Sequence, residues 1–211
     1  MEKDKNSLIK YWKSENVVRD EKVISAFKKI PRENFVLKED LYQAYGDYPL
    51  DIGFGATISQ PTTVVIMLES LDVKKENKVL EIGTGSGYSS ALLSVLVGNK
   101  GKIYTTEIVK ELADFAKNNL KKLRIKNVRL FHIDGSMGLK KYTPYDRIIL
   151  HAGSEDIPDE LIKQLKDNGI FLGPIGNQYN QTMVKIIKKG KRLVKENLGD
   201  FIFVPLRKRE E

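Results

Sequence analysis

A glycine-rich turn between an apolar run and a helical pattern constrains this chain more than any other feature. Residues 79–82 are apolar apart from one acid, Glu81, and they lead directly into the turn at residues 83–87, Gly-Thr-Gly-Ser-Gly. A helical pattern follows at residues 89–97. Glycines at the end of a strand let the backbone turn tightly and come close to a ligand. The order of strand, glycine turn and helix therefore predicts an α/β sheet with a ligand at the carboxyl ends of its strands.

Short apolar runs alternate with helical patterns over the rest of the chain. Helical patterns occupy residues 89–97, 109–123 and 158–165, and the apolar runs are residues 79–82, 102–107, 128–133, 147–150, 170–172, 183–187 and 201–206. This alternation predicts a mostly parallel, Rossmann-like sheet with helices on both faces. The last two runs have no helix of comparable length between them, only the turn at residues 188–191, so we expect an antiparallel hairpin at the far edge of the sheet.

The part of the chain before the glycine turn has a different pattern. Residues 17–30 carry an apolar stripe at helical spacing, and Pro61 opens a second helical pattern that continues to Leu71. Residues 34–61 are rich in Gly, Pro and aromatic residues and show neither helical nor strand periodicity, which is typical of a functional irregular segment. We therefore predict N-terminal helices and a substrate-binding segment over residues 1–72, and a Rossmann-like core over residues 73–211, in a single compact unit.

Composition excludes several classes of protein. There is no cysteine, and the chain has only two histidines, so we expect no metal site. The first residues are charged and no window is apolar enough to span a bilayer, which predicts a cytoplasmic protein without a membrane partner. The net charge of +8 is spread over scattered lysines and arginines interleaved with acids, a distribution that argues against a nucleic-acid partner.

Three features around the glycine turn indicate the ligand. The third glycine follows the first by four residues, whereas the dinucleotide fingerprint needs five. Glu81 would repel a pyrophosphate but suits a cofactor with an amino group and a sulfonium, which predicts S-adenosyl-L-methionine. Glu107 ends the next strand, where a carboxylate accepts hydrogen bonds from ribose hydroxyls, and Asp134 ends the third, where it would accept from the adenine amino group. The predicted cofactor residues are Glu81, Gly83, Thr84, Gly85, Ser86, Gly87, Glu107, Ile108, Asp134 and Gly135.

Each of these features also has a purely structural interpretation. The glycines could form a turn without a ligand, Glu107 could be a capping acid, and Asp134-Gly135 could be ordinary turn chemistry. His132 lies within a predicted strand and is interpreted as structural.

Motifs outside the glycine turn resemble those of the protein-L-isoaspartate O-methyltransferase family over almost the whole chain. The most diagnostic is Thr57-Ile58-Ser59-Gln60-Pro61, which generic methyltransferases lack. Further matching segments are residues 30–36 (Ile-Pro-Arg-Glu-Asn-Phe-Val), 47–50 (Asp-Tyr-Pro-Leu), 52–53 (Ile-Gly), 145–148 (Tyr-Asp-Arg-Ile), 157–158 (Ile-Pro) and 203–206 (Phe-Val-Pro-Leu). The resemblance implies a class I methyltransferase that transfers methyl to the α-carboxylate of L-isoaspartyl residues in damaged proteins.

The resemblance also implies site residues. Ser59 corresponds to the residue that the family treats as catalytic, with Thr57, Ile58 and Val204 beside it as substrate contacts. The same serine could also be the N-cap of the helix that begins near Pro61, which is compatible with the substrate role. The segment after the fourth strand departs from the family pattern because it places His151 at the mouth of the site. That histidine either touches substrate or caps the strand.

Two other functions compete with protein repair. An RNA base methyltransferase would use the same cofactor and the positive charge, but residues 151–154 (His-Ala-Gly-Ser) do not match the Asn/Asp-Pro-Pro-Tyr/Phe motif of amino-group methylation. A non-catalytic module that only binds adenosylmethionine is the other alternative, and the complete motif at residues 57–61 speaks against it.

Overall fold

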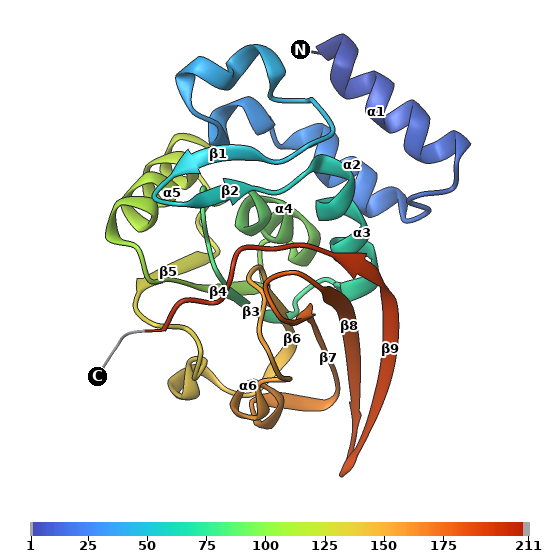
Figure 1. Cartoon of the computed structure of the whole chain (residues 1–211), viewed down its shortest axis with the longest axis vertical. Coiled ribbons are helices and arrows are strands. Elements are labelled where there is room, and N and C mark those ends of the chain that lie inside the picture. The colour runs from blue at the N-terminus through green and yellow to red at the C-terminus, as the bar shows by residue number, and fades with distance from the viewer. Residues whose placement is uncertain (1, 209–211) are drawn as a thin grey trace.

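Except for the last one, the strands of the central sheet follow the apolar runs of the sequence. In the computed structural model, which describes residues 2–208, they are β3 (Lys78–Ile82), β4 (Lys102–Glu107), β5 (Val128–His132), β6 (Tyr145–Leu150), β7 (Leu165–Gly176), β8 (Gln181–Lys189) and β9 (Arg192–Phe201). Their order across the sheet is β5-β4-β3-β6-β7-β8-β9 (Figure 1). The glycine turn follows β3, a central strand, so its ligand would lie over the middle of the sheet.

The direction of the strands confirms the predicted topology. The pairs β3–β4, β3–β6, β4–β5 and β6–β7 are parallel, whereas β7–β8 and β8–β9 are antiparallel. The short turn after β8 leaves no room for a crossover helix, which forces a hairpin at that edge. The fold is thus a mostly parallel Rossmann-like sheet with an antiparallel far edge.

The position predicted for the last strand is wrong. We expected it at residues 201–206, but β9 spans Arg192–Phe201 and is exposed or only partly buried along its length. An edge strand of this kind carries no buried face, so its sequence lacks the alternation that would reveal it. Residues 202–206 instead run back over the sheet, where the N–H of Gly153 donates to the Val204 carbonyl and the N–H of Leu206 to the Gly153 carbonyl, both at 2.8 Å.

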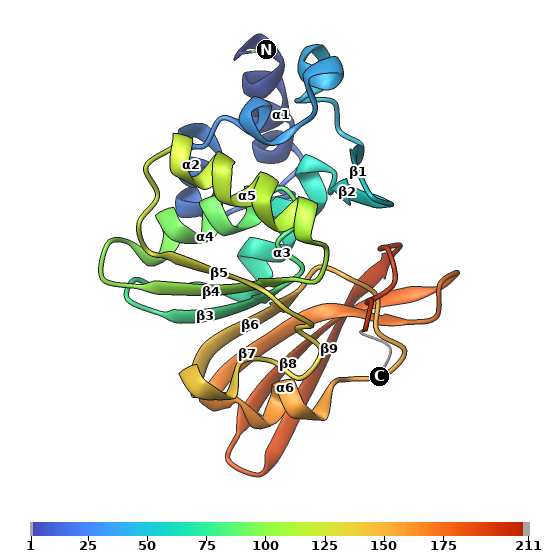
Figure 2. The same ribbon diagram turned by 90° about the vertical axis from the view of Figure 1, so that its left-hand side faces the viewer.

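Helices cover both faces of the sheet. They are α1 (Glu2–Ser14), α2 (Glu21–Lys29), α3 (Pro61–Leu71), α4 (Tyr88–Val97), α5 (Lys110–Lys122) and α6 (Asp159–Lys163), with a short 3₁₀ helix at Lys140–Tyr142. Figure 2 shows α2, α3, α4 and α5 on one side of the sheet and α6 on the other. The helix α3 has the predicted bounds, and Asp20 caps α2 by accepting from the N–H of Lys22 at 2.8 Å.

The segment predicted as irregular contains regular structure. Two 3₁₀ helices, Arg32–Phe35 and Lys38–Gln43, are followed by a hairpin of β1 (Leu50–Gly53) and β2 (Ala56–Ile58). These elements are too short to produce a recognisable period, which explains the error. The hairpin delivers residues 57–59 to the start of α3, at the carboxyl edge of the sheet.

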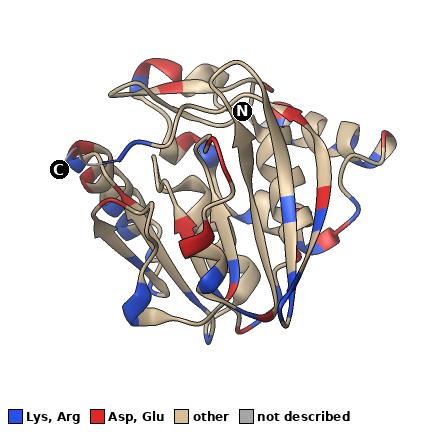
Figure 3. Ribbon diagram, turned by 60° about the horizontal axis from the view of Figure 1, so that its bottom comes forward, with Lys and Arg blue, Asp and Glu red and all other residues tan. Residues whose placement is uncertain are grey.

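One large hydrophobic cluster connects the N-terminal helices with the sheet. It includes Trp12 and Phe27, packed edge to face at 4.7 Å, and extends to Leu172 and Met183 of the sheet. The boundary at residue 72 stays a prediction. Within residues 2–208, no helix is long and apolar enough to cross a bilayer. Figure 3 shows Lys and Arg interspersed with acidic residues over several elements.

Candidate active site

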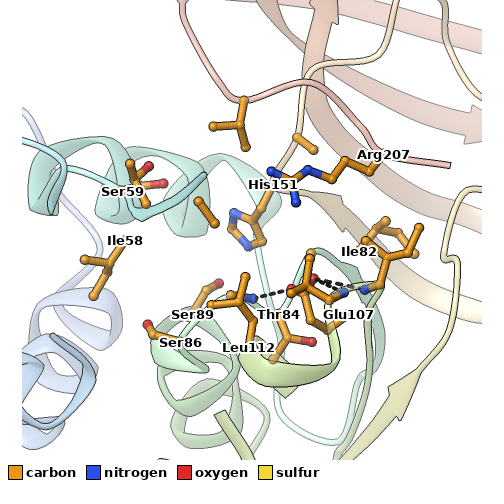
Figure 4. Close-up of a pocket in the computed structure, with 18 of the residues that line it drawn as sticks. Ile58, Ser59, Ile82, Thr84, Ser86, Ser89, Glu107, Leu112, His151 and Arg207 are labelled. Atoms are coloured by element: carbon orange, nitrogen blue, oxygen red, sulfur yellow. Dashed lines mark hydrogen bonds between the residues drawn. The ribbon is translucent and has the colours of Figure 1, made fainter. Parts of the chain in front are cut away.

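A cavity lies at the carboxyl ends of β3, β4 and β6. It is lined by parts of five segments: residues 55–59 of the hairpin, 82–86 of the glycine turn, 106–109 after β4, 151–152 after β6, and 204–207. Side chains from these segments point into one space in Figure 4. The location agrees with the rule that open α/β sheets bind ligands at the carboxyl edge of their strands.

The glycine turn has the backbone geometry that its sequence predicts. Gly83, Gly85 and Gly87 have φ values of 88°, 53° and 88°, a region that side chains rarely permit. The N–H groups of Gly83 and Thr84 both donate to the Thr106 carbonyl at 3.0 Å, which ties the turn to β4. At Gly83 and Gly85 the turn lines the cavity with backbone that carries no side chain of its own.

Glu107 presents a carboxylate to the cavity in a fixed orientation. One of its oxygens, Oε2, accepts from the N–H of Gly85 at 2.8 Å, and the other, Oε1, accepts from the N–H groups of Ile108 and Val109 at 2.9 and 3.1 Å. The side chain is buried but lines the cavity. A carboxylate has about four lone-pair positions, and these three N–H groups occupy three of them, so one remains for a ligand hydroxyl.

The predicted adenine side of the site is only partly in the cavity wall. Gly135 and Ile108 line the cavity, whereas Asp134 does not. The strand β5 ends at His132, two residues earlier than the prediction required, and the Asp134 carboxylate accepts from the N–H of Ser136 at 2.8 Å. A Cβ on Gly135 would lie 2.1 Å from Thr106 Oγ1, so only glycine fits there.

Glu81 lies outside the cavity lining. Its side chain is fully buried, and Oε2 accepts a short hydrogen bond from the hydroxyl of Ser90 in α4. The predicted direct contact between Glu81 and a cofactor has no support from this placement. The group that Glu81 does face is His151, whose Nε2 is 3.3 Å from Oε1.

A second cavity adjoins the first, and four residues line both of them. The wall of the second cavity includes Gln60, Tyr179 and Asp200. The shared residues are Thr57, Ser59, His151 and Val204. Three of these were predicted to contact substrate, and the fourth predicted contact, Ile58, lines only the first cavity.

The interpretation of Ser59 as a helix cap is wrong. The N-cap of α3 is Gln60, and the side chain of Gln60 itself makes no capping hydrogen bond. Asp47 acts there instead, since its carboxylate accepts from the N–H and the hydroxyl of Thr62 at 3.0 and 2.6 Å. Trp12 of α1 donates to the same hydroxyl at 2.7 Å. These bonds hold the segment that carries Ser59 against the N-terminal helices.

A buried cation supports the wall of the cavity from behind. The guanidinium of Arg32 stacks over the ring of Tyr88, with 5.1 Å between its Cζ and the ring centroid, and its Nε donates to the Ala44 carbonyl at 2.7 Å. Burial lowers the pKa of Arg32 to about 10 and raises the pKa of Tyr88. Arg32 is therefore charged and Tyr88 neutral at ordinary pH.

Residues 204–207 form the roof of the cavity, and within this segment Val204 was predicted as a site residue but Arg207 was not. Arg207 lines the cavity and donates to the Phe54 carbonyl at the tip of the hairpin, at 2.7 Å. Nothing in a charged C-terminal sequence signals such a contact. Ser89, Val109 and Leu112 were also missed as lining residues, although their positions at the starts of α4 and α5, next to the carboxyl edge, could have suggested them.

The lining fits S-adenosylmethionine. The glycine turn forms a cradle that side chains would fill, and Glu107 offers an acceptor for a ribose hydroxyl. The buried hydroxyls of Ser89 and Thr106 have no hydrogen-bond partner within residues 2–208, so the wall holds unused polar groups. Over the same residues, no group of three or more His, Asp or Glu could hold a metal ion. The fold and this site define a class I S-adenosylmethionine-dependent methyltransferase.

Comparisons with known proteins identify the family. Residues 2–211 match the family described as protein-L-isoaspartate(D-aspartate) O-methyltransferase. A protein-L-isoaspartate O-methyltransferase from Methanosarcina mazei is 46% identical over 193 residues, which are 91% of this chain and 79% of the relative. The chain belongs to the protein-L-isoaspartate(D-aspartate) O-methyltransferase family.

Solved structures agree with this assignment. One protein-L-isoaspartate O-methyltransferase superposes with a TM-score of 0.86 at 32% identity, covering 95% of this chain, which spans 65% of the length of that protein. A Plasmodium falciparum protein described as a protein-L-isoaspartate O-methyltransferase, solved with S-adenosyl-L-homocysteine, has a TM-score of 0.84 at 25% identity. That match covers 96% of this chain and 98% of the other.

Proposed function

We propose that the enzyme methylates the α-carboxylate of L-isoaspartyl residues in damaged proteins. The observation that carries the proposal is the junction of the two cavities, where Ser59 and Thr57 of the diagnostic motif meet Val204 and His151. A cofactor in the first cavity and a peptide in the second would meet at these residues. The protein names of the relatives support the same substrate.

The donor half of the site consists of the glycine turn and Glu107. The exposed backbone at residues 83–87 would accommodate the methionine end of the cofactor, and Glu107 would accept from one of its ribose hydroxyls. Gly135 and Ile108 would border the adenine. When bound, S-adenosylmethionine supplies a sulfonium methyl group, which passes to a carboxylate oxygen as the C–S bond breaks, leaving a methyl ester and a neutral thioether.

The acceptor half of the site has to align the substrate carboxylate, which is a nucleophile without further activation. A carboxylate is ionised at neutral pH, so the reaction needs orientation and partial desolvation more than a general base. Ser59 would hold one carboxylate oxygen through its hydroxyl, with Thr57 and Ile58 beside it. The roof from Val204 to Arg207 would exclude water. This division of labour is consistent with the absence of an acid–base pair from the predicted residues.

A paired-peptide assay tests the proposal. We expect labelled methyl to pass from S-adenosylmethionine to an L-isoaspartyl peptide and not to the aspartyl peptide of the same sequence. Equal labelling of the two peptides, or labelling of RNA alone, would contradict protein repair. Cofactor binding without labelling of any acceptor would favour the non-catalytic module.

The cellular location is a further part of the proposal. We propose that repair takes place in the cytoplasm; within residues 2–208, no helix is long and apolar enough to cross a membrane. Fractionation of cells that express the protein, followed by immunodetection in the cytoplasmic and membrane fractions, provides the test.

A further inference from the structure

Two buried polar atoms face each other beneath the acceptor site. Glu81 Oε1 and His151 Nε2 are 3.3 Å apart, and neither atom has a hydrogen-bond partner in the part of the chain that the structure describes. Their side chains are 0% and 11% exposed. A buried polar atom left without a partner is costly, so a small rotation that lets Nε2–H donate to Oε1 is favourable.

This pair would decide which of the two ring nitrogens carries the proton in a neutral imidazole. The other carboxylate oxygen of Glu81 accepts from Ser90, which holds the acid in place. A neutral histidine carries its proton on one ring nitrogen, and the hydrogen bond made by that nitrogen decides which one. With Nε2 protonated toward Glu81, Nδ1 keeps its lone pair and acts as an acceptor.

His151 stands where an acceptor could contact substrate. It directly follows β6, lies over the glycine turn, where a Cβ on Gly83 would be 3.5 Å from its own Cβ, and lines both cavities together with Ser59. Figure 4 shows its ring in the middle of the pocket, with Ser59 on one side and Arg207 on the other. Nε2 is the buried ring nitrogen, and Nδ1 is not among the buried atoms without a partner.

We propose that Nδ1 of His151 accepts a hydrogen bond from the backbone N–H of the isoaspartyl residue, with Glu81 as the positioning residue that holds the ring. The inference rests on the proposed function. In an L-isoaspartyl residue, the N–H and the free carboxylate are attached to the same carbon atom. In an aspartyl residue, an additional methylene separates them. A site that binds the N–H at His151 and the carboxylate at Ser59 therefore distinguishes an isoaspartyl residue from an aspartyl residue by the distance between these two groups.

Peptides with a methylated backbone nitrogen test the contact. The isoaspartyl peptide and its counterpart with N-methyl at that residue are compared on the wild type and on His151→Gln and His151→Asn. Asparagine can place an oxygen near the position of Nδ1, whereas glutamine extends toward Glu81 and leaves no acceptor there. For the wild type and His151→Asn, we expect N-methylation to lower kcat/KM by about tenfold, mostly through KM, as for one lost hydrogen bond.

The two histidine variants separate this role from a structural one. For His151→Gln, the unmodified peptide should already show the tenfold loss, and N-methylation should cost little more. Cofactor affinity measured by calorimetry should stay within about twofold in both variants. An equal N-methyl penalty in the wild type and in His151→Gln would overturn the contact, because the ring would then not sense that N–H.

Nitrogen NMR of labelled histidine gives a readout that does not depend on activity. The chain has two histidines, so the spectrum of His151→Gln assigns the remaining one. In the wild type at mildly alkaline pH, we expect His151 to carry its proton on Nε2, and we expect Glu81→Gln to weaken that preference. A proton on Nδ1 in the wild type would overturn the inference. A wild type that methylates no isoaspartyl peptide overturns the proposed function and this inference together, whereas an active wild type with the wrong tautomer overturns only the role of His151.

Discussion

Replacing Glu107 with glutamine should weaken cofactor binding while the fold persists. The carboxylate accepts three backbone N–H groups, from Gly85, Ile108 and Val109. Glutamine has a single oxygen. Its best orientation keeps that oxygen on Ile108 and Val109 and turns the amide NH₂ toward the N–H of Gly85, so that two donors face each other at the glycine turn.

The size of the effect follows from the hydrogen bonds lost. A hydrogen bond to a charged group contributes about 1.5–3 kcal/mol. The oxygen of Glu107→Gln is already occupied by two amides, so one ribose hydroxyl loses its charged acceptor. A loss of about 2 kcal/mol raises the dissociation constant roughly thirtyfold. Calorimetric titration with S-adenosylmethionine and with S-adenosylhomocysteine measures this dissociation constant directly.

The matched control is Glu111→Gln, which removes the same charge from the exposed first turn of α5. An exposed substitution changes free energies by less than about 0.5 kcal/mol, so affinity should stay within about twofold. Thermal unfolding of both variants without ligand shows that each is folded. Equal affinities of folded Glu107→Gln and Glu111→Gln would refute the role of the carboxylate in binding ribose.

Other parts of the site give three more predictions. Ser59→Ala should lower kcat/KM for the isoaspartyl peptide by roughly tenfold to a hundredfold, as for one lost hydrogen bond to a carboxylate. Cofactor affinity should stay unchanged. A loss of cofactor affinity instead would assign the serine to the donor half. Gly135→Ala should destabilise the protein by roughly 1–3 kcal/mol, because its Cβ would lie 2.1 Å from Thr106 Oγ1, and an unchanged melting temperature would show that this contact is wrong. Burial raises the pKa of Tyr88 and of Tyr145, so the unfolded chain loses these protons first and stability should fall above about pH 10. A titration to alkaline pH checks this prediction, with tyrosinate absorbance reporting ionisation and circular dichroism reporting unfolding. Ionisation of both rings in a protein that stays folded would contradict the prediction.

The sequence predicts the sheet and the positions of the glycine turn and Glu107 well, because local pattern determines them. The strand before the glycine turn, the turn and the acid that ends β4 are each short, continuous signals. Their meeting at one edge follows from parallel strand direction alone. Gly83 and Glu107 are therefore predictable without any knowledge of tertiary contacts.

The features that sequence did not predict depend on tertiary contacts or on exposure. The strand β3 is buried on both faces, so periodicity does not reveal that Glu81 faces α4 and His151 rather than the cavity. The polar edge strand β9 has no buried face to mark it, and the contact of Arg207 with the Phe54 carbonyl joins residues far apart in the chain. Only the folded structure brings these groups together.

The roof of the cavity also affects the order in which the enzyme is completed during synthesis. Arg207 follows every other residue of the site in the chain and reaches back to the hairpin that was made near the beginning. Proteins are made from the N-terminus, and their early parts can fold while the ribosome is still at work. The glycine turn and the Ser59 segment leave the ribosome well before the covering segment does. A closed methyl-transfer site therefore exists only after residue 207 has left the ribosome.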